Sequence, residues 1–240
     1  MSFIEFNGSR SDDFYLHLEK DLAFPSPGRN GSFQKIDGQN GEVRTGDDSL
    51  NNVSMSFPFR VVLPSGLTVE EIANDVSNWV KKDCLWHDLY FDGDPDYVYR
   101  AIYAGEYSFD RIVSYYGKCV LNFTMKPYKF LQTGLREKTI QSGEALTNPT
   151  HWAAYPRFSV KGQGNIIIKI GSEELRLLKV DQGVIVDSLY QTATTLDGAT
   201  PAWGKVVSYP LPLIHSGRQE ITITGTVSEL KILPRWEMIL

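Results

Sequence analysis

The sequence predicts a mainly β protein of two domains, with a single α-helix in the first. Three observations support this. Short runs alternate between apolar and polar residues along most of the chain, Gly and Pro recur between those runs, and only one stretch repeats at helical spacing. The 240 residues suffice for one large β domain or two ordinary ones.

The clearest strand is residues 117–130, in which apolar and polar residues alternate with a period of two. Its apolar face consists of Cys119, Leu121, Phe123 and Met125. Pro127 has no N–H to donate and is expected to stop the ladder. We therefore expect this strand to close a first domain, residues 1–133, ahead of a second domain, residues 134–240.

Shorter strands are expected earlier, at residues 3–6 and 12–18, and a longer one at residues 53–62, where Pro58 indicates a sheet edge or a bulge. Between them, residues 25–50 are rich in Gly and charge. They predict long surface loops around one short strand near residues 33–36, and loops of that length often serve interaction.

Residues 68–82 form the one predicted helix. Thr68 and Glu71 have the spacing of a capping box, and apolar residues including Trp79 repeat along one face. A lone amphipathic helix among strands must cover either a sheet or a neighbouring subunit, and Trp79 is expected in the core.

The rest of the chain reads as strands and turns. A hairpin is expected at residues 89–103 and a strand at 108–116, followed by a polar connection at 132–148. From residue 156 onward strands recur every 8–12 residues, which is typical of a β-sandwich. We expect these strands at residues 158–160, 166–170, 175–180, 184–187, 203–208, 221–224 and 230–236, with turns at 161–164, 171–172, 196–198 and 216–219.

Composition excludes several classes of protein. The net charge of −5 is unsuited to gripping nucleic acid, and no apolar run is long enough to span a membrane. The start of the chain lacks the basic and apolar regions of a signal peptide, so synthesis in a cytoplasm is expected. A disulfide between Cys84 and Cys119 is possible, but two buried free thiols fit a reducing cytoplasm better.

No motif predicts catalysis or a cofactor. The chain lacks a nucleophile elbow, zinc-binding motifs and a phosphate-binding loop, and residues 162–164 read as a hairpin turn. Three groups could bind ions but are more simply explained as surface residues. These are the four histidines (His17, His87, His151, His215), the acidic turns (Asp92, Asp94 and Asp96; Asp47 and Asp48), and the basic cluster (Lys126, Lys129, Arg136, Lys138). We therefore predict no catalytic, cofactor-binding or metal-binding residues, and no enzymatic activity.

Several stretches together resemble the distal tail (Dit) family of long, flexible-tailed bacteriophages. In the first half these are residues 3–8, the pairs Asp37-Gly38 and Asn40-Gly41, the single helix, and residues 123–128. In the second half they are residues 146–149, 155–158, the strand ending at Asp187, and residues 216–221.

The resemblance implies a structural hub at the phage tail tip, or baseplate. Family members form a homohexameric ring from N-terminal β-sandwich-like domains, and two rings can stack. The ring joins the tail tube protein to the tail-tip protein and passes DNA as cargo through its channel. Galectin-like C-terminal β-sandwiches project outward and can hold a receptor-binding protein. The resemblance thus implies a virion protein made in the host bacterial cytoplasm, with no membrane partner.

The chain departs from true galectins, because their sugar-binding residues are absent. Trp203-Gly204 is followed by Lys205-Val206, where galectins carry a Glu two residues after the Gly. The second domain is therefore expected to dock proteins. The alternative function is a carbohydrate-binding adhesion protein built on the same β-sandwich.

Charge is distributed unevenly between the two halves. Residues 1–130 carry 13 Lys and Arg against 19 Asp and Glu, a balance of −6, whereas residues 131–240 carry 11 against 10, a balance of +1. Negative walls repel phosphate, so an acidic first domain suits a channel that DNA must traverse without binding. A ring interface needs an edge strand, a helix face or a long loop, and residues 25–50 and 68–82 are candidates for it.

Overall fold

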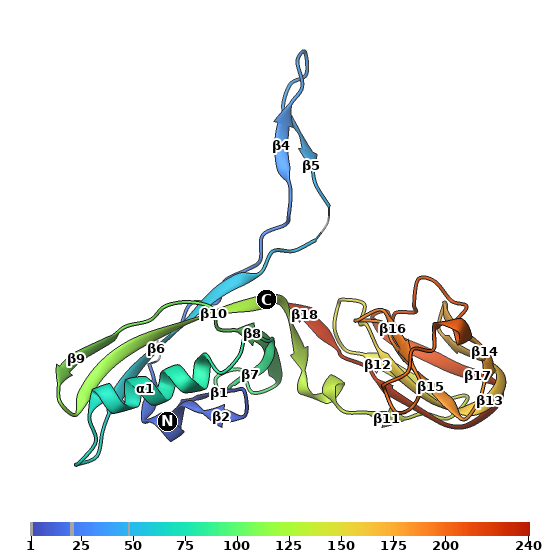
Figure 1. Ribbon diagram of the computed structural model, residues 1–240. Coiled ribbons are helices and arrows are strands. Elements are labelled where there is room, and N and C mark those ends of the chain that lie inside the picture. Colours follow the sequence, from blue (N-terminus) through green and yellow to red (C-terminus); the bar gives the residue numbers. More distant parts are fainter. Residues whose placement is uncertain (1, 20–21, 48) are drawn as a thin grey trace. The chain divides into compact units, whose positions relative to one another are not determined.

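The computed structural model describes residues 2–19, 22–47 and 49–240, which form two compact units (Figure 1). Unit 1 comprises residues 1–129 with 239–240, and unit 2 comprises residues 130–238. The predicted mainly β fold with a single α-helix is confirmed for the described residues. None of the described helices is long and apolar enough to cross a membrane.

Unit 1 is built on a nine-stranded sheet. Its strands are β1 (Ile4–Phe6), β2 (Ser9–Arg10), β3 (Leu16–Leu18), β6 (Val53–Val62), β7 (His87–Phe91), β8 (Tyr97–Ile102), β9 (Phe109–Val113), β10 (Tyr116–Leu131) and β18 (Glu237–Ile239). The strand order is β2-β1-β7-β8-β10-β6-β3, and β9 and β18 also pair with β10. Where a second strand was expected from residue 12, a short 3-10 helix, η1 (Ser11–Phe14), comes first and only Leu16–Leu18 is extended.

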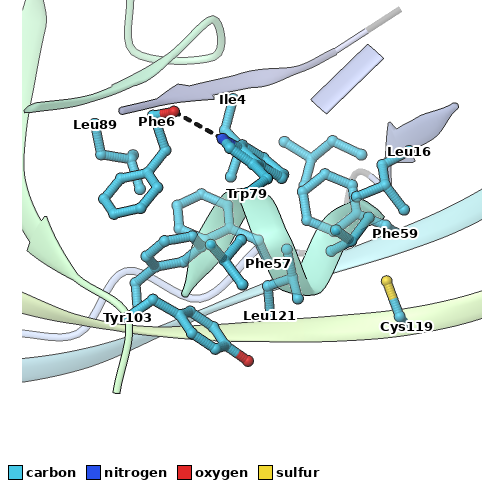
Figure 2. Packing of buried hydrophobic residues seen from close by; sticks show 14 of the residues in the cluster. Ile4, Phe6, Leu16, Phe57, Phe59, Trp79, Leu89, Tyr103, Cys119 and Leu121 are labelled. Atoms are coloured by element: carbon cyan, nitrogen blue, oxygen red, sulfur yellow. Dashed lines mark hydrogen bonds between the residues drawn. The ribbon is translucent and has the colours of Figure 1, made fainter. Parts of the chain in front are cut away.

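The helix α1 (Val69–Val80) begins where the sequence predicts, because the capping box forms. The Thr68 hydroxyl accepts the Glu71 N–H at 3.3 Å, and the Thr68 N–H donates to the Glu71 carboxylate at 3.0 Å. The apolar stripe of α1 packs into the core of its own unit, where the Trp79 indole N–H donates to the Phe6 carbonyl at 2.8 Å (Figure 2). Of the two surfaces that the helix was expected to cover, a sheet or a neighbouring subunit, its apolar stripe covers the sheet of its own unit.

The centre of this sheet is the pairing of β10 with β6, which runs from Tyr116 opposite Val62 to Met125 opposite Val53. The expectation that Pro127 stops β10 is wrong, since the strand continues to Leu131. β6 has already ended at this point, so Pro127 removes no donor from the pairing of β10 with β6. The Pro127 carbonyl still accepts the Leu240 N–H at 3.0 Å.

Pro58 does not mark an edge strand, because β6 lies between β10 and β3. The Pro58 carbonyl accepts the Glu19 N–H at 2.9 Å, so its main chain faces the β3 side. The β3 pairing reaches only Phe59 opposite Leu18. The missing N–H therefore falls just past the last rung of the β3 pairing, so no interior rung loses a donor.

Unit 2 is built on a seven-stranded sheet. Its strands are β11 (Lys138–Thr139), β12 (Ala145–Asn148), β13 (Arg157–Ile170), β14 (Glu173–Val180), β15 (Gly183–Asp187), β16 (Thr192–Thr194) and β17 (Gly217–Leu233). The order is β11-β17-β13-β15-β16, with β12 also on β17 and β14 on β13. The residues expected as a connection, 132–148, thus already contain a 3-10 helix, η2 (Gln132–Leu135), and two strands of this sheet.

Two long strands, β13 and β17, form the spine of unit 2 and replace several expected turns. Residues 162–164 are not a hairpin turn, since β13 passes through them with shifts in register against its partners. A Cβ at Gly162 would lie 2.3 Å from the Thr226 carbonyl oxygen, so this close approach of two strands requires glycine. Bulges of this kind bend a strand and let the sheet curl around its core.

Two further expectations for unit 2 are corrected. Residues 217–219 lie in β17 rather than in a turn, and residues 203–208 are not a strand. Trp203–Lys205 forms a short 3-10 helix, η3, and Val206 makes only an isolated bridge with Leu177.

A buried ion pair fixes the end of β15 to the segment that follows β17. The Arg235 guanidinium donates two hydrogen bonds of 2.7 Å to the two Asp187 carboxylate oxygens. The same carboxylate accepts the N–H groups of Leu189 and Tyr190. Both charges are therefore satisfied, as buried charges must be.

Glu237 next to this pair is different, because its side chain is buried with only 4% of its surface exposed. Burial raises the pKa of its carboxyl from 4.5 to about 7, and the Arg235 guanidinium opposes this rise. The folded chain thus holds a proton that the unfolded chain releases. The stabilisation is complete below pH 4.5 and is lost as the pH rises through about 7.

We predict that Glu237→Gln raises the free energy of unfolding at pH 8 by up to about 3 kcal/mol, because the amide needs no proton. At pH 5 the change should be small. Urea unfolding at the two pH values tests this, with the exposed Glu220→Gln as the matched control. An equal effect of Glu237→Gln at both pH values would contradict the assignment.

Candidate assembly surfaces

The structure corrects the expectation of loops at residues 25–50. This segment contains a β-hairpin, with β4 (Ser32–Lys35) paired to β5 (Glu42–Thr45). We call residues 28–50 the arm. Figure 1 shows it standing clear of the sheet, and every residue from 28 to 47 is exposed.

Local interactions define the base of the arm. The Asn30 N–H donates to the Ser49 carbonyl at 2.8 Å, and the Arg44 guanidinium donates to the Asn30 and Asp47 carbonyls at 2.6 and 3.0 Å. Gly31 and Gly46 cross so closely that a Cβ on Gly46 would lie 2.5 Å from the Gly31 Cα. Both glycines have a φ of +144°, which side chains disfavour.

The arm has apolar side chains but no core of its own. Phe33 is 67% exposed, and Ile36 and Val43 are exposed as well. An isolated two-stranded hairpin is marginally stable in water. The arm is therefore built like an element that is completed by contact with another molecule.

The outer face of α1 is polar. Its apolar residues are buried in unit 1, and the exposed positions are Glu70, Glu71, Asn74, Asp75 and Asn78. This face of residues 68–82 could take part in a polar contact, but it has no apolar surface to bury.

The face of the sheet that α1 does not cover is also largely polar. Ser56 donates to the Asn122 side-chain oxygen at 2.6 Å across β6 and β10. Arg60, Lys118 and Lys126 supply positive charge there.

At one end of this face lies a small apolar group on neighbouring strands. Tyr116 of β10 stands opposite both Val62 of β6 and Val113 of β9, and Ile112 and Tyr115 adjoin them. Ile112 is 57% and Tyr115 59% exposed. We call Val62, Ile112, Val113 and Tyr115 the β9 patch.

In the acidic turn at residues 92–96, Asp94 is engaged by donors of the protein itself. Asp94 accepts hydrogen bonds from the Lys129 ammonium at 2.6 Å and the Tyr99 hydroxyl at 2.5 Å. This carboxylate ties the β7–β8 turn to the end of β10, so it is more than a solvated turn. Asp47 accepts the Ser49 hydroxyl and N–H, which hold the pKa of its carboxyl below the usual range; Asp48 lies outside the described residues. Among residues 2–19, 22–47 and 49–240, no group of three or more His, Cys, Asp or Glu could hold a metal.

The histidines and the basic cluster do not converge. His87 pairs with Asp83 at 2.7 Å and His215 with Glu173 at 3.1 Å. His17 is half-buried and His151 exposed. Lys126 lies over the Trp86 ring at 4.2 Å and Lys129 over the Tyr97 ring at 3.9 Å, whereas Arg136 and Lys138 belong to unit 2.

The cysteines are both free, and they differ in environment. Cys119 is buried, and burial raises the pKa of its thiol to about 12. Cys84 is exposed, which corrects the expectation that both thiols are buried. It lies in the loop after α1, beyond the helix's apolar stripe.

The surface that sequence reasoning described least well is the arm. Alternation in Ser32–Lys35 and in Glu42–Thr45, with Asp37-Gly38 and Asn40-Gly41 between them, is a hairpin signal. The signal is weak because neither strand has a buried face, and periodicity reports burial.

Residues 11–125 match the family model described as the phage tail protein RIFT-related domain. The whole chain is similar to the crystal structure of SPP1 Dit (gp 19.1), titled a paradigm of hub adsorption apparatus in Gram-positive infecting phages. The TM-score is 0.72 at 14% identity, over 97% of each chain. The resemblance to the distal tail (Dit) family is confirmed at the level of the fold.

Two structures of the phage P2 baseplate in its activated conformation, with Ca and with Sr, are also similar. Their TM-scores are 0.53 and 0.52 at 9% identity, over 100% of this chain and 99% of theirs. Comparison with curated protein sequences found no match. At these identities the Dit and baseplate structures establish a shared fold.

We predict that a thiol reagent modifies one cysteine in the native protein and two after unfolding in denaturant. Cys84 is exposed, whereas Cys119 is buried and its thiolate is disfavoured. Absorbance with an aromatic disulfide reagent measures this, and Cys84→Ser should abolish the native reaction. Fast native modification of the Cys84→Ser variant would contradict the burial of Cys119.

Proposed function

We propose that this protein is a structural component of a phage virion, the hub at the distal end of a tail. The observation that carries the proposal is the arm, an ordered hairpin whose apolar side chains Phe33, Ile36 and Val43 are exposed. The family match of residues 11–125 and the Dit-like fold support it.

In this proposal, copies of the chain form a homohexameric ring, and two rings can stack. The arm and the surface that receives it lie on different parts of one chain, so the contact is heterologous. Such a contact repeats from copy to copy and closes into a ring when its rotation suits. Unit 1 forms the ring, and unit 2, a galectin-like module, lies outside it.

The proposed partners are other tail proteins. The ring joins the tail tube protein on one side to the tail-tip protein on the other, and unit 2 holds a receptor-binding protein. The protein is made in the host bacterial cytoplasm and is incorporated into the virion. It has no enzymatic role and docks proteins rather than sugars.

DNA is proposed to pass through the ring as cargo. The negative balance of residues 1–130 suits a passage that does not hold phosphate. Charge is divided within unit 1, since the uncovered sheet face carries Arg60, Lys118 and Lys126 while α1 presents Glu70, Glu71 and Asp75. Reversing the acids that border the channel should slow genome ejection, whereas unchanged ejection kinetics would count against acidic walls.

We predict that the purified protein has a mass of six chains, or twelve if rings stack, by size-exclusion chromatography with light scattering. Replacing residues 30–47 by Gly-Ser-Gly should give a monomer, because the arm then cannot reach another copy. The variant should still fold and unfold cooperatively on heating, since no core residue is removed.

The matched control is Tyr209→Ser, which removes a ring that is 84% exposed on unit 2 and should leave the mass unchanged. A wild-type chain that remains monomeric at every concentration would overturn the hub. If that monomer also bound a glycan array, the carbohydrate-binding alternative would be favoured.

A further inference from the structure

Unit 1 has a second surface that lacks a partner strand in the described chain, the edge strand β9. In the described chain β9 pairs with β10 alone, from Phe109 opposite Cys119 to Val113 opposite Tyr116. Its other edge therefore offers main-chain N–H and C=O groups that no strand of the described chain takes up. Natural proteins usually shorten, charge or cover such an edge.

Side chains protect this edge only in part. Residues 110–113 are all exposed, and two of them, Asp110 and Arg111, are charged. Arg111 is turned to α1, where its guanidinium donates to the Glu70 carboxylate at 2.6 Å. What remains beside the free edge is the β9 patch, with Ile112 57% exposed and Val113 also exposed.

We propose that a strand of the arm of one copy pairs with β9 of the next copy, extending the nine-stranded sheet across the boundary between them. The partner of β9 is thus a second copy of this chain. The inference rests on the proposed function and adds to it the surface that receives the arm.

The two edges match in length and in chemistry. β4 and β5 have four residues each, and β9 has five. Among the strands that the structure describes, β4 and β5 pair only with one another, so each keeps one edge without a partner strand there. Strand addition satisfies the main chain of both partners and places alternate side chains on the same face. In the β4–β5 register Phe33 lies opposite Arg44 and Val43 opposite Gln34, so the two apolar side chains are on opposite faces of the hairpin. Whichever of these faces continues the face that carries the β9 patch is then able to cover the patch with its exposed Phe33 or Val43.

The other large surfaces of unit 1 fit the arm less well. The outer face of α1 is acidic and polar. The uncovered sheet face between β6 and β10 has one charged rung, Lys118–Arg60, one apolar rung, Val120–Pro58, and two polar rungs formed by Ser, Asn and Thr. Neither provides a free strand edge. Apolar side chains of the arm would lose contact with water at β9 and gain little by lying on either of these faces.

Cysteine pairing tests the contact directly in the full chain. In a Cys84→Ser background we would combine Phe33→Cys or Val43→Cys with Ile112→Cys or Val113→Cys, and oxidise the assembled protein. At least one combination should give a ladder reaching six chains on a non-reducing gel, because each copy donates one arm and receives another. Single-cysteine variants should stop at dimers, and Val43→Cys with Tyr209→Cys, on unit 2, should give no ladder.

Charge at the edge provides a second test that does not depend on register. Ile112→Asp combined with Val113→Asp should weaken assembly at least about tenfold in concentration, because a burial-driven contact now requires desolvating carboxylates. The circular dichroism spectrum should not change, since both residues are exposed. Val120→Asp, on the polar face of β10, is the matched control and should assemble normally.

The outcomes distinguish a failure of the arm–β9 contact from a failure of the proposed hub. Rings of wild-type mass with no ladder from any arm–β9 combination, and with normal assembly of the Asp variant, would overturn this contact and leave the hub in place. A wild-type chain that is monomeric would overturn the hub itself. An Asp variant with a lost circular dichroism signal would leave the decision to the cysteine pairs.

Discussion

Unit 1 depends on the burial of one face of β10. Cys119, Leu121, Phe123 and Met125 are all buried, and the strand is held in register by β6 along most of its length. α1 is placed by the same core, through its apolar stripe and the hydrogen bond from Trp79 to Phe6. A sheet with one face committed in this way has its other face and its edges left for external contacts.

Those external contacts are where the molecule departs from a self-contained fold. The arm is ordered by hydrogen bonds at its base and by two closely crossing glycines, and no core supports it. β9 pairs with β10 alone in the described chain, so its other edge has no partner strand there. Elements like these are liabilities in a monomer, because free edges and exposed apolar side chains promote association. In a chain that assembles with its own copies they are the means of assembly.

Sequence patterns failed where a residue's effect depends on its partner strand. Pro127 lacks a donor, but it lies beyond the end of β6, so β10 continues through it. Gly162 resembles a turn residue, yet it is required by the close approach of Thr226 within a continuous strand. The charged groups that the sequence explains as surface residues also have separate partners in the structure. Asp94 serves Lys129 and Tyr99, and the histidines pair separately.

The sequence by itself determined the mainly β class, the position and capping of α1, the buried face of β10, and the resemblance to phage distal tail proteins. Each of these can be recognised from local periodicity, from a capping pair or from short motifs. Only the tertiary structure decided that residues 28–50 form an arm, that α1 covers its own sheet, and that β9 is left with a free edge. Those properties depend on which surfaces find partners within the chain, and local spacing carries no record of what remains unpaired.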